Sequence, residues 1–265
     1  MSLFKTKMWM WGHDAGAHNM YNLPTPSKMS PLEGAMYLGT PNMCRVVFGN
    51  SPEPPFERDA LALDVMDNVV WSIIGDSGSV RNDGGKADIA AVAEVAKTHK
   101  NIIGGIMDDF QPSRLGGDPL VLAEFKKRLS EGAGRDMQLW TVAYTHDLDR
   151  GDIVPFFDEC DVATLWTWKS GDIFRLEESF GKFRALWGYD RPLYGGCYLW
   201  GYGDGGVPMP AGLLRFQLDT YYKWLHGHKI DGVIFCSNNV CDIGLEAVKI
   251  VKDWIYDHRD EKLDF

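Results

Sequence analysis

The chain has 265 residues, which is enough for one large domain or two small ones. Its hydrophobic content of 45% and charged content of 24% are those of an ordinary globular protein. The formal net charge of −10 at pH 7 argues against a nucleic-acid or anionic-membrane partner, because both need a basic surface.

The sequence contains few features that indicate the cellular location of the protein. The sequence has five cysteines, an odd number without CxxC spacing, which does not support a disulfide framework. Three of them lie within or at the edge of apolar strand-like runs and are interpreted as small buried hydrophobic residues. No apolar run in the sequence is long enough to span a bilayer, and the N-terminal segment MSLFKTKMWMWG lacks the apolar core of a signal peptide. We expect no membrane partner, while cytoplasmic location, export with removal of a signal, and oligomeric state all stay open.

Eight short apolar runs have the length and composition of strands, and each precedes a segment with helical periodicity or helix-start signals. The expected strands lie at residues 7–12, 45–50, 69–75, 102–107, 138–144, 162–168, 193–200 and 232–238. The expected helical segments begin at Ser30 or cover residues 58–68, 86–100, 118–129, 153–160, 175–188, 211–229 and 244–258. Ser30 and Asp118, each followed by proline, are the expected N-caps of their helices.

This strict alternation indicates an α/β protein in which parallel strands are joined by right-handed crossovers. With eight strand–helix units, the most economical arrangement is a closed (β/α)8 barrel. An open doubly wound sheet is the alternative, but GHDAGAH after the first strand is not its GxGxxG fingerprint. We therefore expect a single TIM-barrel domain over residues 1–265.

Polar and aromatic residues gather where the expected strands end, which is where barrels of this kind carry out catalysis. Carboxylates combined with aromatic rings are typical of a carbohydrate site, because sugar C–H faces stack on rings and hydroxyls pair with polar groups. The expected substrate-binding residues are His13, Asp14, Asn50, Asp76, Tyr144, His146, Trp166, Trp168, Lys169, Trp200, Tyr202 and Asn238.

Asp108 and Asp109 follow the expected strand 102–107 directly. Successive strand residues face opposite sides of a sheet, but beyond the last ladder bond both side chains can turn toward the mouth of the barrel. Two carboxylates so close cannot both ionise freely, so one can hold a proton near neutral pH and act as a general acid. We therefore expect the pair to carry catalysis.

The segment GGIMDDF, residues 104–110, resembles the end of the fourth strand in barrel glycoside hydrolases, and most of all the β-N-acetylglucosaminidases that keep an Asp–Asp pair there. The resemblance covers this strand end and the general barrel layout. It implies a glycosidase that acts on a carbohydrate or glycoside and needs no cofactor. It also implies that Asp108 polarises a 2-acetamido group of the substrate, which acts as the nucleophile, and that Asp109 protonates the leaving oxygen.

A different hydrolase layout would combine one aspartate of the fourth strand with Asp172 on the loop after the sixth strand. In the structural alternative, Asp108 and Asp109 cap a loop or pair with Arg114 or Lys169. Alternation turns about half of the aromatic residues at the ends of the sixth and seventh strands inward, so some of them would simply fill the interior. These aromatic residues are Trp166, Trp168, Tyr198, Trp200 and Tyr202.

Two other function classes stay open. The second class is a different kind of barrel enzyme, such as an aldolase, an isomerase or a metal-dependent hydrolase. In an aldolase of this kind, Lys169 could form a Schiff base with the substrate. His13 and His146 could be metal ligands, but four residues separate His13 from His18, so the HxH spacing common in barrel metallohydrolases is absent and we expect no metal. The third class is a catalytically inactive barrel that binds glycans.

Overall fold

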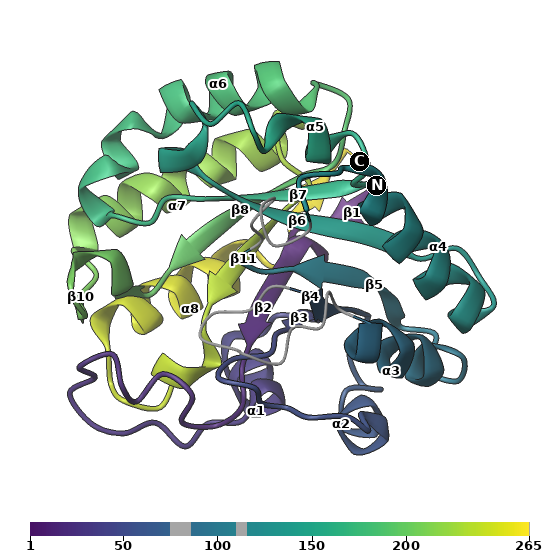
Figure 1. Cartoon of the computed structure of the whole chain (residues 1–265). Helices are drawn as coiled ribbons and strands as arrows, with labels where there is room; N and C mark the ends of the chain where they lie inside the picture. The colour runs from purple at the N-terminus through teal and green to yellow at the C-terminus, as the bar shows by residue number, and fades with distance from the viewer. Residues whose placement is uncertain (75–85, 110–115, 265) are drawn as a thin grey trace.

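A closed barrel of eight parallel strands forms the centre of the protein (Figure 1). The computed structural model describes residues 1–74, 86–109 and 116–264. The barrel strands are β2 (Met8–Gly12), β3 (Asn42–Arg45), β4 (Asn68–Ile74), β5 (Ile102–Met107), β6 (Gln138–Tyr144), β7 (Val162–Trp166), β8 (Leu193–Tyr198) and β11 (Gly232–Cys236). Neighbours follow chain order, and β11 pairs with both β8 and β2, which closes the ring. The prediction of an α/β barrel is confirmed.

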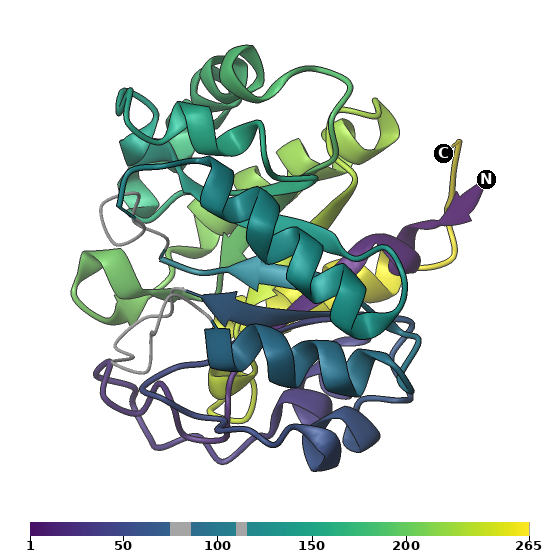
Figure 2. The ribbon, with the colours of Figure 1, turned by 45° about the vertical axis from the view of Figure 1, so that its right-hand side comes forward.

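Helices follow the strands and pack around the outside of the barrel (Figures 1 and 2). They are α1 (Pro31–Leu38), α2 (Glu57–Ala62), α3 (Lys86–Ala96), α4 (Leu120–Ala133), α5 (Val154–Phe157), α6 (Leu176–Trp187), α7 (Ala211–His226) and α8 (Glu246–His258). The predicted capping box at α1 is present, because Ser30 accepts a hydrogen bond from the Glu33 amide and Glu33 reaches back to the Ser30 amide. Among the described residues, no helix combines the length and apolar character needed to cross a bilayer.

Short elements join the barrel strands and tie the chain ends together. β1 (Ser2–Leu3) pairs antiparallel with β12 (Lys262–Leu263), so the two termini lie side by side (Figure 2). β9 (Trp200–Gly201) and β10 (Val207–Pro208) form a small hairpin after β8. In the described part of the chain the 3-10 helices are η1 (Phe4–Lys7), η3 (Thr145–Asp147), η4 (Ser170–Arg175), η5 (Tyr202–Asp204) and η6 (Asn238–Val240).

The second barrel strand corrects a prediction. Residues 45–50 were expected to form it, but β3 ends at Arg45 and shares only that residue with the expected range. Its first residue, Asn42, is polar yet buried, because its side-chain amide donates to the backbone oxygens of Thr6 and Met8. Because these hydrogen bonds satisfy the Asn42 amide, a polar residue can begin a buried strand. A search for apolar runs cannot find such a strand start.

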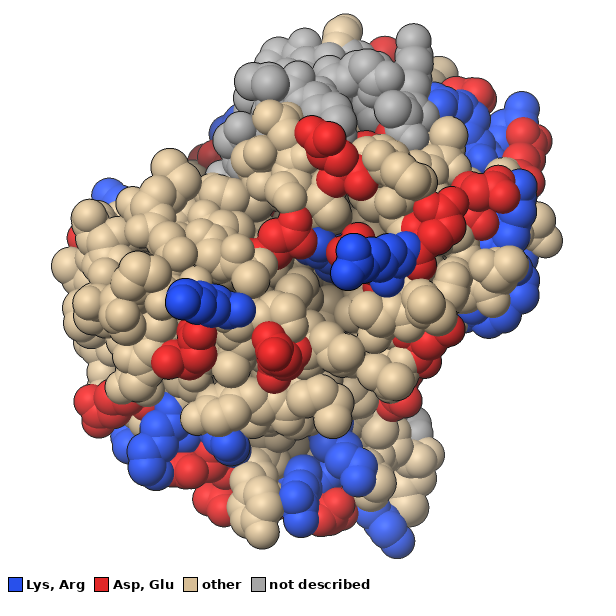
Figure 3. Space-filling model, turned by 90° about the horizontal axis from the view of Figure 1, so that it is seen from below, with Lys and Arg blue, Asp and Glu red and all other residues tan. Residues whose placement is uncertain are grey.

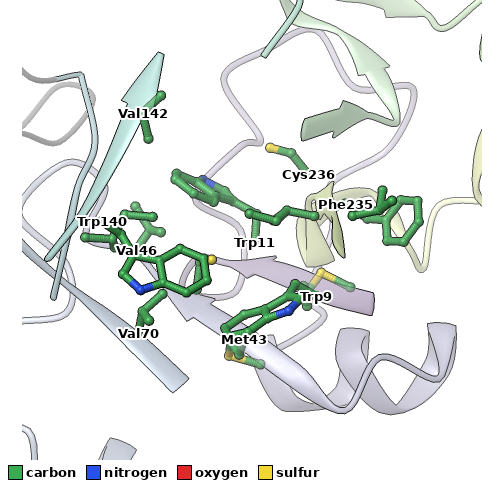
Figure 4. Close-up of a cluster of buried hydrophobic side chains, with 14 of the residues drawn as sticks. Trp9, Trp11, Met43, Val46, Val70, Trp140, Val142, Phe235 and Cys236 are labelled. Atoms are coloured by element: carbon green, nitrogen blue, oxygen red, sulfur yellow. The ribbon is translucent and has the colours of Figure 1, made fainter. Parts of the chain in front are cut away.

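Aromatic side chains fill the barrel in layers, because alternate strand residues point inward. In the inner layer, the ring of Trp140 lies 5.0 Å from Trp9 and 4.7 Å from Tyr194, measured between ring centroids. Two residues further along β2, the ring of Trp11 lies 5.1 Å from that of Trp166. Figure 4 shows Trp9 and Trp140 together in the interior, with Trp11 beside them. The second layer forms the floor of the site described below.

The surface mixes charges of both signs. On the face shown in Figure 3, acidic and basic side chains are interspersed among uncharged ones. All five cysteines are free and buried, the three that the sequence placed in or beside strand-like runs among them.

Candidate active site

A cavity of about 460 Å³ lies at the carboxyl ends of the barrel strands. Its described lining consists mainly of aromatic rings, imidazoles and carboxylates. The structure brings eight of the predicted site residues to this cavity. They are His13, Asp108, Asp109, Tyr144, His146, Trp166, Trp168 and Tyr202.

Both members of the aspartate pair line the cavity. The strand β5 ends at Met107, directly before them. Asp108 is buried, with 5% of its surface exposed, whereas Asp109 is partly exposed and has a φ of 49°. Because neighbours on a strand normally point to opposite sides, this left-handed backbone at Asp109 is what turns the second carboxylate toward the same cavity. The Tyr144 hydroxyl donates a hydrogen bond of 2.8 Å to Asp109 Oδ1.

Two tyrosines next to the aspartates keep their protons. Burial raises the pKa of Tyr144 well above its ordinary value, and the charges of Tyr198, Asp108 and Asp109 raise it further. Burial also raises the pKa of Tyr198 well above its ordinary value, with Cys236 and the two aspartates adding to the effect. Both hydroxyls are therefore hydrogen-bond donors at neutral pH, and Tyr144 donates to the carboxylate beside it.

A pair of histidines forms another part of the cavity wall, with the rings of His13 and His18 4.4 Å apart. Burial is the main cause that holds the pKa of His13 well below its ordinary value, and burial lowers the pKa of His18 to about 3. His18 Nδ1 lies 2.7 Å from the Tyr202 hydroxyl and 3.1 Å from Ser237 Oγ. Burial raises the pKa of Tyr202, so its hydroxyl keeps its proton for donation to His18 Nδ1. Both imidazoles are therefore neutral, and donation by Tyr202 leaves the His18 proton on Nε2.

Two buried asparagines after β11 hold the loop that carries these histidines. Asn238 accepts a hydrogen bond of 2.9 Å from the His13 amide and donates one of 2.9 Å to the His13 carbonyl. Asn239 accepts a hydrogen bond of 3.3 Å from the His18 amide. Asn238 was expected to bind substrate, but it does not line the cavity, and its amide is used to position His13.

The hairpin of β9 and β10 brings Tyr202 to the cavity. Its glycine-rich segment, residues 201–206, packs against the aromatic wall: a Cβ on Gly203 would lie only 2.3 Å from the Trp168 carbonyl oxygen. The Asp204 carboxylate accepts a 3.0 Å hydrogen bond from the Ser170 amide, which ties the hairpin to the segment after β7. Because Gly203 has no side chain, the hairpin can pack directly against the backbone of Trp168, and this packing holds the Tyr202 ring in the cavity wall.

Two further predicted residues have structural partners instead of a place in the cavity. The buried Arg45 side chain binds the Asp14 carboxylate, which also accepts a hydrogen bond from Ser51. Trp200 is buried and donates a 2.9 Å hydrogen bond to the Tyr21 carbonyl. Both were expected to bind substrate because they follow strand ends, but their polar atoms are used by neighbouring loops.

The remaining predicted residues lie elsewhere. Asn50 lies five residues beyond the end of β3, since that strand ends at Arg45, and it is outside the cavity lining. Lys169 and Asp172 are exposed and also lie outside the lining. Lys169 is therefore not placed to form a Schiff base with a ligand in the cavity, and Asp172 is not placed to act there together with Asp108 or Asp109. Asp76 and the proposed ion-pair partner Arg114 lie outside the described residues.

Several lining residues were not predicted as binders. Cys236 lies at a strand end, Trp11 one residue before one and Val142 two residues before one, and alternation along the strand could have identified them. Tyr198 was assigned only to the aromatic set. His18, Tyr21, Phe48 and Asp147 come from loops or a 3-10 helix, where the sequence has no periodic pattern to use. Among the described residues, no cluster of three or more His, Cys, Asp and Glu side chains could hold a metal ion.

Comparison with known proteins finds similarity in structure only. No family model matches the sequence, and no curated protein matches it. The chain is similar to the family 18 chitinase ChiB of Flavobacterium johnsoniae, with a TM-score of 0.58 and 9% identity over 97% of this chain and 95% of that chain. A family 18 N-acetylglucosaminidase from Paenibacillus barengoltzii gives a TM-score of 0.53 and 13% identity over 93% and 99%. A mutant tryptophan synthase α-subunit from Pyrococcus furiosus gives 0.53 and 11% over 96% and 98%. These likenesses show the (β/α)8 fold.

Proposed function

We propose that this protein hydrolyses glycosidic bonds, with Asp108 and Asp109 as its catalytic residues. The observation that carries the proposal is that two adjacent carboxylates line one aromatic-walled cavity at the carboxyl ends of the barrel strands. Aromatic rings such as Trp168 offer stacking surfaces for sugar faces, and hydrolysis needs carboxyl groups at the scissile bond. The cavity volume of about 460 Å³ is in the range of small-molecule sites.

Asp109 is the general acid/base in this proposal. It is the more exposed of the two aspartates, so it can reach a leaving-group oxygen and the water that later replaces it. Tyr144 occupies Asp109 Oδ1 with its 2.8 Å hydrogen bond, which leaves Oδ2 to carry the transferred proton. Protonation of the leaving oxygen by Asp109 breaks the glycosidic bond while positive charge develops on the sugar ring. The oxygen of a water molecule then forms the new bond to the anomeric carbon, and its proton returns to Asp109.

Asp108 stabilises this developing charge, or orients the substrate group that does so. It is buried at the cavity wall and lies near enough to Tyr144 and Tyr198 to raise the pKa of both hydroxyls. A carboxylate that is largely shielded from water acts more strongly on a nearby positive charge than an exposed one. The resemblance of GGIMDDF to β-N-acetylglucosaminidases gives Asp108 the same kind of role.

The similar structures include glycosidases. Two of them are a chitinase and an N-acetylglucosaminidase, whereas the third is a tryptophan synthase subunit with the same fold. Because one barrel supports different reactions, the cavity residues carry the functional proposal. A glycan or glycoside is the partner that follows from it.

A panel of nitrophenyl glycosides of both anomers, N-acetylhexosaminides included, tests the proposal directly. We expect the wild-type protein to release nitrophenol from at least one member between pH 4 and pH 8, about the range in which carboxyl catalysts work. The Asp172→Asn variant changes an exposed carboxylate outside the cavity and should match the wild type. If every glycoside stays intact across this pH range, hydrolysis is not the activity of this cavity.

A further inference from the structure

A buried imidazole on the cavity wall has no hydrogen-bond partner for its side chain in the described part of the protein. His13 is 3% exposed and lines the cavity, and its Nδ1 is sealed from solvent without a partner. Its backbone, in contrast, is held on both sides, because Asn238 accepts from the His13 amide and donates to the His13 carbonyl. The protein therefore fixes this ring in place but gives it no polar contact, which is unusual for a buried polar group.

His13 and the neighbouring His18 both present an N–H donor to the cavity. Their Nε2 atoms have no hydrogen-bond partner among the described residues but, unlike Nδ1 of His13, are accessible from the cavity that both rings line. Donation by the Tyr202 hydroxyl to His18 Nδ1 leaves the His18 proton on Nε2. The same tautomer is favoured for His13, because a buried N–H without an acceptor is rarer than a buried acceptor without a donor. Burial keeps both rings neutral by lowering the pKa of each.

These donors lie across the cavity from the two aspartates. His13 follows β2 directly, whereas Asp108 and Asp109 follow β5. Since β2 and β5 are three positions apart in the closed ring of eight strands, the segments after them stand on nearly opposite sides of the mouth. A sugar whose glycosidic oxygen lies at Asp109 would therefore turn the far edge of its ring toward the histidines. In a pyranose this edge carries the 3- and 4-hydroxyl groups.

The surroundings of the two imidazoles favour an uncharged partner. The Phe48 ring lies 5.5 Å from that of His13 and 5.3 Å from that of His18, measured between centroids. The Arg45 guanidinium, whose charge reaches His13, is already paired with two carboxylates. Two neutral N–H donors beside an apolar ring can satisfy hydroxyl oxygens, but they cannot offset the cost of desolvating a carboxylate or a sulfate.

We propose that His13 and His18 form a donor pair that recognises the 3- and 4-hydroxyl oxygens of an uncharged sugar. The inference rests on the glycosidase function proposed above. It makes glycosides of neutral pyranoses with both of these hydroxyls free the substrate class, and so a sugar at the end of a chain in preference to an internal 4-linked one. Each Nε2–H donates to one hydroxyl oxygen, and a substrate that lacks one of these oxygens leaves a buried donor unsatisfied.

Nitrogen-15 NMR of the histidine rings in the full-length protein tests the site without turnover. We expect both rings to be neutral, with the proton on Nε2, between about pH 5 and pH 8. From a panel of methyl glycosides of glucose, galactose and N-acetylglucosamine in both anomers, at least one should shift the Nε2 signals of both rings, and its 4-deoxy analogue should shift them less. A proton on Nδ1 of His13, or no shift with any of these glycosides, would overturn the donor pair.

Kinetics with modified nitrophenyl glycosides test the same contacts during turnover. For the glycoside that is cleaved best, removing the 3- or the 4-hydroxyl should each lower kcat/KM by roughly tenfold, the effect of leaving a buried donor without its acceptor. In His13→Phe the loss at one of the two positions should disappear and the other should persist. His13→Leu repeats the measurement if His13→Phe does not fold. Both losses should persist in His226→Phe, which changes a histidine outside the cavity lining.

The outcomes separate this inference from the proposed function. If a methyl glycoside shifts both ring signals but no nitrophenyl glycoside is cleaved, the donor pair stands and hydrolysis fails. If glycosides are cleaved and removal of the 3- and 4-hydroxyls costs no activity, hydrolysis stands and the donor pair fails. Losses at both positions that are the same in the wild type and in the His13 variant would also overturn the pair, because these hydroxyls would then contact other residues.

Discussion

Replacing Asp109 by asparagine is expected to lower kcat/KM by about 10²- to 10⁴-fold for glycosides with alkyl leaving groups, because these need a proton to depart. The loss should be much smaller for dinitrophenyl glycosides, whose leaving group departs readily as an anion. This dependence follows from assigning Asp109 as the acid that protonates the leaving oxygen. Steady-state kinetics on a matched alkyl and dinitrophenyl pair of the best glycoside measures it.

Asp108→Asn provides the contrast. A residue that stabilises charge on the sugar ring should matter for both leaving groups, so this variant should lose activity on the alkyl and dinitrophenyl substrates to a similar extent. If Asp109→Asn instead reduces both substrates equally and Asp108→Asn shows the leaving-group dependence, the roles of the two aspartates are exchanged. If neither variant loses activity, the pair is structural.

The largest effect on stability is expected for Gly196→Ala in β8. A Cβ at this position would lie 2.1 Å from Trp166 Cδ2. That ring cannot easily move, because Trp166 is 2% exposed and its Nε1 donates a 2.8 Å hydrogen bond to Thr164 Oγ1. Overpacking typically lowers the free energy of unfolding by about 1–3 kcal/mol, and we expect the upper end of this range here because the displaced indole would also disturb the cavity floor. Urea denaturation of the variant and the wild type measures the difference.

Gly181→Ala is the matched control. Gly181 lies within α6, and a Cβ there would have no atom within 4 Å. Alanine is favoured over glycine in a helix by roughly 0.5–1 kcal/mol, so this variant should be slightly more stable than the wild type. Equal stability of Gly196→Ala and Gly181→Ala would mean that the contact with Trp166 does not constrain β8.

The fold could be predicted because its strands are short, apolar and separated by helical patterns. The ranges expected for the strands at 102–107 and 138–144 coincide with β5 and β6. The strand expected at 45–50 was wrong because hydrophobicity was the only signal used. Its true start, Asn42, depends on hydrogen bonds to the backbone of β2 and the residues before it, and such tertiary partners do not appear in a local pattern.

The site could be predicted mainly where a residue lies at a strand end or a few residues after it. Asp108, Tyr144 and Trp166 lie at or next to strand ends, and the barrel architecture places them at the mouth. Asp14 and Asn238 also follow strands, but the Asp14 carboxylate is bound by Arg45 and the Asn238 amide is hydrogen-bonded to the backbone of His13. The sequence does not reveal these partners, because they are distant in the chain or belong to other loops. Phe48 was missed for another reason: residues 45–50 were expected to form a strand, whereas β3 ends at Arg45 and leaves Phe48 in the loop that follows.

The most direct test is a crystal structure of the Asp109→Asn variant bound to an uncleaved glycoside. The account predicts the sugar ring within the cavity and its glycosidic oxygen about 3 Å from the substituted side chain at position 109, within hydrogen-bonding distance. A glycoside bound outside this cavity, or one whose glycosidic oxygen faces away from both position 108 and position 109, would contradict it.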